Sequence, residues 1–255
     1  MTFAQYPSLA ERVIFVTGGA TGIGADIVEA FAQQRARVAF VDLQADAGEA
    51  LAEKIAARGE PKPLYLRGDV TDIPALQAAI GRARDELGPI GVLVNNAAND
   101  RRHKVDDVTV DFWDETQNVN LRHHFFAAQA VRAQMRELGG GSIINMSSTA
   151  WRFGAAEMPA YATAKAAVLG LTRALARAFG PDNIRVNAIE PGAVMTPKQR
   201  QLWYKTEDSV QAMVERQLLR RVLLGEEIAR MILFLAADDS RMITKQSFIV
   251  DAGLR

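Results

Sequence analysis

The sequence predicts an α/β fold: one doubly wound domain of about seven parallel strands with helices on both faces. Three observations predict it. Apolar runs of strand length alternate with segments of helical periodicity along the whole chain. Such strict alternation favours a parallel sheet joined by right-handed crossovers. No Pro/Gly/Ser-rich linker and no low-complexity tract divides the 255 residues, so we expect a single domain over residues 1–255.

The expected elements follow one another in a regular order. Strands are expected at Val13–Val16, Val38–Val41, Pro63–Leu66, Val92–Val94, Ser142–Asn145, Val186–Ile189 and Ser247–Val250. Helical periodicity covers Ile23–Gln34, Ala45–Arg58, Ile73–Leu87, Phe112–Leu138 and a segment from Pro159 to the breaker Gly180-Pro181. The segment at about 195–220 is interpreted as a flap over a substrate. Ligands of such a sheet are expected at the carboxyl ends of its strands.

Composition limits the possible partners. With 49% hydrophobic and 24% charged residues, the chain is typical of a globular protein with a substantial core. A net charge of zero predicts neither nucleic acid nor an anionic membrane as a partner. The lack of cysteine excludes disulfides and thiolate metal sites and fits the cytoplasm, and we expect no metal. The densest apolar run, Met231–Ala237, is a short core segment. Met1–Pro7 has no pattern of a signal peptide.

The first strand leads into a glycine-rich turn that predicts a dinucleotide site. Gly18, Gly22 and Gly24 lack the Cβ atoms that would prevent a tight turn and the approach of a pyrophosphate, and Thr21 and Ile23 lie between them. The helix that follows offers free backbone N–H groups and a partial positive charge to a phosphate. We therefore expect all five residues to contact a cofactor.

The end of the second strand indicates which cofactor. Asp42 closes that strand, where a carboxylate accepts hydrogen bonds from the adenosine ribose hydroxyls and repels a 2′-phosphate. Neither Ala20-Thr21 nor Leu43-Gln44 supplies a cation for that phosphate. NAD is therefore expected, with NADP as the less favoured alternative. Asp42 could instead serve only as the N-cap of the helix that begins near Ala45.

A serine, a tyrosine and a lysine form the candidate catalytic group. Tyr161 and Lys165 are four residues apart on a predicted helix, so they share one face. A nearby ammonium group is expected to lower the pKa of the phenol, which then accepts a proton from a substrate hydroxyl. Lys165 could also hydrogen-bond the ribose of the nicotinamide. Ser148 follows the fifth strand, where its hydroxyl can orient the reacting oxygen. A pair exposed on the surface is the alternative.

Taken in order, these motifs resemble the short-chain dehydrogenase/reductase family across essentially the full length of the chain. The glycine turn, the acid at 42, Asp69-Val70, Asn95-Asn96-Ala97, Ser148 and the Tyr161/Lys165 pair all have the family's spacing. The resemblance implies a Rossmann-type fold, a homotetramer, and Asn120 as a fourth catalytic residue that positions a water beside Lys165.

The same resemblance implies further contacts with the cofactor. Asp69 and Val70 would flank the adenine, while Asn96, Ala97 and Ala98 would lie along the cofactor. The nicotinamide amide would meet residues after the sixth strand, namely Pro191, Gly192, Val194 and Thr196. Two positions depart from the family pattern: Ala98, where many relatives have glycine, and Lys245, which stands in a Thr-Lys-Gln sequence instead of Thr-Gly-Gln.

The loop after the fourth strand predicts a polar substrate, because a site built to pair hydroxyls rejects analogues without them. We expect Asn99, Arg102 and His103 from this loop to bind substrate, together with Ser148 and Tyr161. Further candidates are Trp151, by stacking on a sugar ring, and Glu157, with Glu190, Trp203 and Tyr204 as weaker ones. A solvated loop and a core tryptophan are the alternatives.

A finer resemblance narrows the substrate. The segments Asn95–His103 and Asn118–His123, the tryptophan after Ser148 and Lys198–Tyr204 resemble the bacterial sugar 1-dehydrogenases, nearest to their xylose dehydrogenase branch. The implied reaction oxidises C1 of a cyclic pentose, hexose or 6-deoxyhexose to its lactone. Two alternatives stay open: an NAD(P)-dependent dehydrogenase or reductase of keto-acyl or steroid-like substrates, and a nucleotide-sensing protein without catalysis. The sequence leaves the sugar, its anomer and the direction in the cell undefined.

Overall fold

A seven-stranded, entirely parallel sheet forms the centre of the protein, which confirms the predicted fold class. The computed structural model describes residues 3–254. Met1, Thr2 and Arg255 lie outside it, and so do the first two residues of the segment Met1–Pro7, for which a prediction was made above. The strands are β1 (Val13–Thr17), β2 (Arg37–Asp42), β3 (Leu64–Arg67), β4 (Ile90–Asn95), β5 (Gly141–Met146), β6 (Ile184–Pro191) and β7 (Ser247–Val250). Their order is β3-β2-β1-β4-β5-β6-β7.

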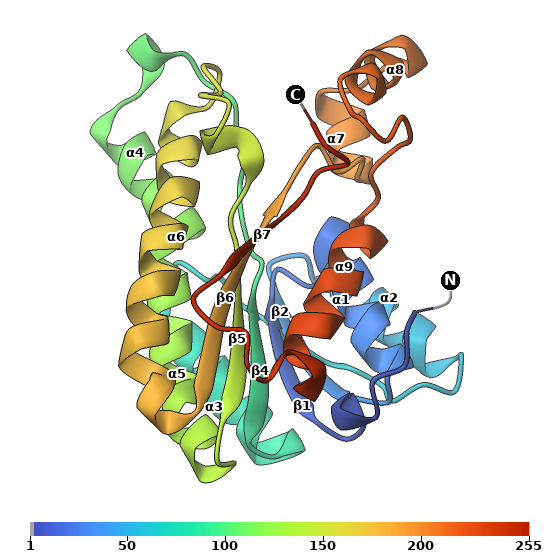
Figure 1. Cartoon of the computed structure of the whole chain (residues 1–255), viewed down its shortest axis with the longest axis vertical. Helices are drawn as coiled ribbons and strands as arrows, with labels where there is room; N and C mark the ends of the chain where they lie inside the picture. The colour runs from blue at the N-terminus through green and yellow to red at the C-terminus, as the bar shows by residue number, and fades with distance from the viewer. Residues whose placement is uncertain (1–2, 255) are drawn as a thin grey trace.

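Helices cover both faces of the sheet. They are α1 (Gly22–Gln33), α2 (Ala45–Ala56), α3 (Ile73–Leu87), α4 (Val110–Gln117), α5 (His123–Glu137), α6 (Pro159–Phe179), α7 (Pro197–Leu202), α8 (Glu207–Glu215) and α9 (Gly225–Ala236). A π-helical segment, η3 (Asn118–Arg122), separates α4 from α5, and short 3₁₀ turns occur at Pro7–Leu9, Val105–Asp107, Thr149–Trp151, Gly180–Asp182 and Asp238–Ser240. In Figure 1, α3, α5 and α6 lie on one face and α1, α2 and α9 on the other.

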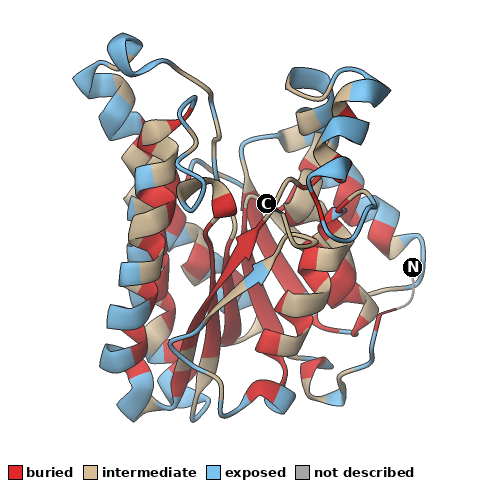
Figure 2. Ribbon diagram, turned by 45° about the horizontal axis from the view of Figure 1, so that its top comes forward, coloured by how far each residue is buried: buried red, intermediate tan, exposed pale blue. Residues whose placement is uncertain are grey.

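Alternation along the strands divides the core into two layers. In β1, Ile14 and Val16 pack with the α1 and α9 side, whereas Val13 and Phe15 pack with the α3, α5 and α6 side. Successive strand residues point to opposite faces, so a strand buried on both faces is apolar throughout, as β1 is. Figure 2 shows the buried strands at the centre and exposed residues on the outer helix surfaces and the loops at the top. Among residues 3–254, no helix has the length and apolarity needed to span a bilayer.

One helical segment matches its expectation and another differs. The apolar run Met231–Ala237 is confirmed as a core segment, and most of it belongs to α9, which packs along α1. The single helix expected over Phe112–Leu138 is interrupted by η3. There the side-chain amide of Asn120 donates to the Thr116 carbonyl at 2.9 Å.

A half-buried carboxylate at the contact of α1 and α9 makes stability depend on pH. Burial, then the charges of Glu29 and Glu226, raise the pKa of Asp26 to about 6, against an opposing effect of Lys54. A raised pKa means that the folded state favours the protonated form of Asp26. The contribution of this protonation to the free energy of unfolding is therefore full below pH ~4 and is lost as pH rises through about 6.

Asp26→Asn is therefore expected to raise the free energy of unfolding at pH 8 by roughly 1–2 kcal/mol, after allowance for partial exposure. Urea denaturation at pH 8 and pH 5 checks this, because the gain should shrink at pH 5. Asp85→Asn, on the exposed face of α3, is the matched control and should leave both values unchanged. An equal gain at both pH values would contradict the assignment.

Candidate active site

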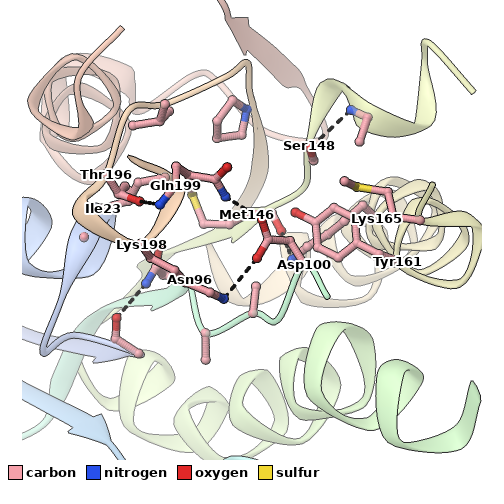
Figure 3. A pocket seen from close by; sticks show the side chains of 18 of the residues that line it. Ile23, Asn96, Asp100, Met146, Ser148, Tyr161, Lys165, Thr196, Lys198 and Gln199 are labelled. Carbon is pink, nitrogen blue, oxygen red and sulfur yellow. Dashed lines mark hydrogen bonds and ion pairs between the residues drawn. The ribbon is translucent and has the colours of Figure 1, made fainter. Parts of the chain in front are cut away.

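A cleft of about 820 Å³ opens at the carboxyl ends of the strands. Its walls come from the turn after β1, the ends of β2 to β6, the start of α6 and the segment that leads into α7. Figure 3 shows side chains from these separate elements turned toward one space. The cleft thus lies where a doubly wound sheet is expected to bind its ligand.

The glycine-rich turn leaves no room for side chains. Gly18 has φ of +67°, and a Cβ on it would lie 2.7 Å from the Cα of Ala97. Gly22 also has a positive φ, +57°, and a Cβ on Gly24 would collide with the Gly18 carbonyl oxygen. The Asn96 amide fixes the turn by donating to that same oxygen at 2.8 Å. Because Thr21 forms no side-chain cap, the first N–H groups of α1 remain available to an anion.

Asp42 lies at the end of β2 and lines the cleft. Its carboxylate accepts hydrogen bonds from the backbone N–H groups of Ala20 and Gln44, each at 3.0 Å. The N-cap of α2 is Gln44 and not Asp42, so the capping alternative does not describe this residue. A carboxylate has about four acceptor positions, so two remain for a ribose.

The other residues expected at the cofactor also lie in the cleft wall. They are Thr21, Ile23, Asp69, Val70, Asn96, Ala97, Ala98, Pro191, Gly192, Val194 and Thr196. Among residues 3–254 there is no group of three or more His, Asp or Glu side chains placed to hold a metal ion.

Tyr161 and Ser148 meet at one side of the cleft. Tyr161 lies in the first turn of α6 and Ser148 directly after β5, and both side chains line the cleft. The Ser148 hydroxyl accepts from the Ala150 N–H at 3.1 Å, which fixes its direction. Burial, then the charge of Asp100, raises the pKa of Tyr161, and the side chain of Ser148 opposes that rise. The protein's own groups therefore keep the phenol protonated.

Lys165 lies one turn further along α6 and is fully buried. Its Nζ donates to the Met146 carbonyl at 2.8 Å and lies 5.7 Å from the centroid of the Tyr161 ring. Burial lowers the pKa of Lys165 to about 7, and Asp100 opposes this. The sequence predicted that this amine lowers the pKa of the Tyr161 phenol. The net effect is instead a raised pKa, because burial disfavours the charged forms of both groups.

Asn120 is buried behind the cleft wall. Its amide accepts from the Asn99 N–H at 2.9 Å and donates to the Asn99 carbonyl at 3.1 Å, in addition to its bond to Thr116. The side chain thereby fixes the loop that follows β4. Its role in positioning a water remains a prediction.

The loop after β4 is extended, and its residues alternate between two sides. Ala98, Asp100 and Arg102 line the cleft, whereas Asn99 and Arg101 line a small hollow on the opposite side. This is the two-residue periodicity of an extended chain. Of the residues expected to bind substrate, Arg102 is in the cleft and Asn99 is not. Asp100, which sequence analysis did not select, is in it.

His103 stabilises the start of α6. Its Nε2 accepts from the Ala160 N–H at 3.3 Å, and its ring packs edge-on against Phe112. The backbone N–H of His103 donates to the Glu157 carbonyl. It lies next to Tyr161 in the structure without lining the cleft, whereas Glu157 does line it.

Trp151 and Glu190 contact each other. The indole N–H of Trp151 donates to the fully buried Glu190 carboxylate at 2.9 Å, and Arg152 pairs with the same carboxylate at 2.7 Å. Neither Trp151 nor Glu190 lines the cleft. Glu190 has the arginine partner that a buried carboxylate requires.

The α7 region contributes polar groups to the cleft. Lys198 and Gln199 line it, as does Tyr204, and Trp203 lies under the Arg102 guanidinium at 4.2 Å. The buried Nε of Arg102 has no hydrogen-bond partner among the described residues. The sequence signals for Asp100 were its place in the segment Asn95–His103, which carries the resemblance to sugar 1-dehydrogenases, and its spacing of two residues from Arg102.

A glycine turn at a helix start, an acid closing the next strand and a Ser/Tyr/Lys group at the same edge define a nicotinamide-dependent oxidoreductase. A family model described as Enoyl-(Acyl carrier protein) reductase matches residues 18–255. The chain belongs to the short-chain dehydrogenase/reductase family, which confirms the resemblance.

Two curated relatives cover nearly the whole chain. The "Probable galactose dehydrogenase GalD" of Rhizobium meliloti (strain 1021) is 50% identical over 98% of both chains. The D-xylose 1-dehydrogenase of Caulobacter vibrioides (strain NA1000 / CB15N) is 44% identical over 100% of both. A blue fluorescent protein from a metagenomic library, solved in complex with NADPH, has a TM-score of 0.88 at 36% identity, covering 96% of this chain and 98% of its own.

Proposed function

We propose that the protein oxidises C1 of a cyclic aldose, a pentose, hexose or 6-deoxyhexose, to the lactone with NAD. The observation that carries this proposal is the meeting, in one cleft, of the Ser148/Tyr161/Lys165 group with a polar wall that includes Arg102 and Glu157. The galactose and xylose dehydrogenase names of the two relatives support the same substrate class.

Each catalytic side chain has a task in this reaction. Tyr161 takes the proton of the anomeric hydroxyl as the C1–H bond breaks, and Ser148 holds the same oxygen by a hydrogen bond. The bound cofactor supplies the hydride acceptor. The positive charge of the oxidised cofactor would lower the pKa of a nearby phenol, and this would favour the phenolate of Tyr161. This external charge is needed because burial alone keeps the phenol neutral.

A substrate panel tests the function. Initial rates of NADH formation are measured with galactose, xylose, arabinose and fucose, and the lactone is identified by NMR. We expect turnover with at least one sugar and a lactone product. Turnover only of keto-acyl or steroid-like substrates would replace this proposal with the first alternative. Cofactor binding without turnover of any of these would favour a nucleotide-sensing protein.

The preference for NAD rests on Asp42. Asp42→Asn keeps an acceptor for one backbone N–H group but removes the negative charge that disfavours a 2′-phosphate. We expect KM for NAD to rise about tenfold or more and KM for NADP to fall, since hydrogen bonds to charged groups contribute about 1.5–3 kcal/mol. Steady-state kinetics with both cofactors check this, with Asp46→Asn on α2 as the control. An unchanged NAD/NADP ratio would remove Asp42 from the discrimination.

A homotetramer in the cytoplasm completes the proposal. Ala160 and Ala164 pack within their own chain, while Ala174 and Gly170 are exposed on the outer side of α6 and Phe125 on α5. Small exposed residues allow close approach of a second subunit. The lack of cysteine supports a reducing compartment. Sedimentation at micromolar concentration tests the tetramer, and a monomer would contradict it.

A further inference from the structure

The extended loop after β4 brings a carboxylate to the catalytic side of the cleft. Asp100 lies between Asn99 and Arg101, which face away from the cleft. It lines the cleft on the same side of the loop as Ala98 and Arg102. Figure 3 shows Asp100 between the α7 side chains and the Tyr161 ring. After burial, the Asp100 charge is the next influence on the pKa of both Tyr161 and Lys165, which places it within electrostatic reach of the reacting groups.

Asp100 is held by two side chains of α7. One carboxylate oxygen pairs with the Lys198 ammonium at 3.0 Å, and the other accepts from the Gln199 amide at 2.5 Å. Thr196 caps the same helix by accepting from the Gln199 N–H at 3.2 Å. The carboxylate is about one-fifth exposed, against one-half for Lys198. The Asp100 carboxylate is therefore fixed in direction, and the Lys198 ammonium beside it stays exposed to solvent.

The carboxylate retains capacity for a ligand. An ionised carboxylate has about four acceptor positions on its two oxygens, and the α7 contacts use one on each. Neighbouring hydroxyls of a polyol offer two donors at a spacing that the two oxygens of one carboxylate can accept together. Hydrogen bonds to a charged acceptor are the stronger kind, and they discriminate against a ligand that lacks the donors.

We propose that Asp100 is a substrate-binding residue: it accepts hydrogen bonds from hydroxyls of the sugar ring other than the one at C1 and, through Lys198 and Gln199, couples their binding to the position of α7. The inference rests on the proposed sugar oxidation and adds the group that distinguishes a polyol from a simple cyclic alcohol. Arg102, whose buried Nε lacks a partner among the described residues, lies two positions further along the same wall.

The test compares the best sugar of the panel with 2-hydroxytetrahydropyran, which has the same ring and anomeric hydroxyl but no other hydroxyl. For Asp100→Asn we expect kcat/KM with the sugar to fall about 10- to 100-fold, mainly through KM. Values with 2-hydroxytetrahydropyran should not fall, because removing the Asp100 charge lowers the pKa of Tyr161 and so does not disfavour the phenolate, and the Kd of NAD by calorimetry should be unchanged. Asp106→Asn, the same change on an exposed part of this segment, is the control.

The outcomes separate the possible failures. If the wild type oxidises neither compound, the proposed function fails, and Asp100 with it. If it oxidises the sugar and Asp100→Asn does so equally well, only this inference is overturned. An equal loss with both compounds, reproduced by the pair Lys198→Met and Gln199→Leu, would show that Asp100 acts only by holding α7. A melting temperature and NAD affinity equal to wild type establish that the variant is folded.

Discussion

Replacing Tyr161 with phenylalanine is expected to lower kcat by about 10²- to 10⁴-fold, the range for a lost general base. Tyr161 lines the cleft together with Ser148, and in the proposed reaction its hydroxyl is the group that accepts the proton. Phenylalanine keeps the ring and its packing. The Kd of NAD, measured by calorimetry, should therefore stay within about threefold of wild type.

A second tyrosine of the cleft serves as the control for that experiment. Tyr204 lines the same cleft and is partly buried, so Tyr204→Phe removes a hydroxyl from the opposite wall. We expect kcat within a few fold of wild type for this variant. Unchanged turnover in Tyr161→Phe, or an equal loss in both variants, would refute the assignment of Tyr161 as the base.

The second large effect is expected for Lys165→Met. The change removes the buried amine beside Tyr161, which is partly charged near pH 7, and its bond to the Met146 carbonyl. Because this partial charge and the polar group beside the phenol are both lost, we expect kcat to fall by about 10²-fold or more, with weaker NAD binding. Stopped-flow rates and calorimetry measure the two losses, and Lys205→Met, at an exposed lysine that does not line the cleft, is the control.

The same variant reports on pH and stability. Because burial lowers the pKa of Lys165 to about 7, the unfolded chain binds one more proton than the fold between pH ~7 and ~10.5. The contribution of Lys165 is therefore unfavourable at low pH and is relieved as pH rises. The stability of wild type relative to Lys165→Met should rise from pH 6.5 to pH 9 in urea titrations. A constant or falling difference would mean that the amine stays charged throughout.

The parts of the fold and site that could be predicted depend on local sequence. The position of the glycine turn follows from three glycines, of which Gly18 and Gly24 have no room for a Cβ and Gly22 has a positive φ. The helix carrying Tyr161 and Lys165 follows from a run without breakers. The alternation of strands and helices was sufficient to predict the parallel sheet. These features each need only a short window of sequence.

Other features depend on contacts between distant segments. The Asn120 amide determines which residues of the loop after β4 face the cleft, because it fixes the backbone of Asn99 from 21 positions away. Selecting Asn99 and His103 as substrate ligands correctly located the loop, but the alternation that turns Asp100 inward cannot be read from composition. Likewise, the pairing of Trp151 with Glu190 joins residues 39 positions apart.

The π-helical segment between α4 and α5 holds one residue more than an α-helical turn, because its hydrogen bonds run from residue i to residue i+5. The widened turn accommodates this residue locally, so deleting it would restore an ordinary α-helical turn while α5 continued to bury Ala127 and Val131. The deletion would instead disturb Asn120, whose amide bonds both Thr116 of its own helix and Asn99 of the loop after β4. The irregular turn thus connects the long helix to the loop of the cleft through a single side chain.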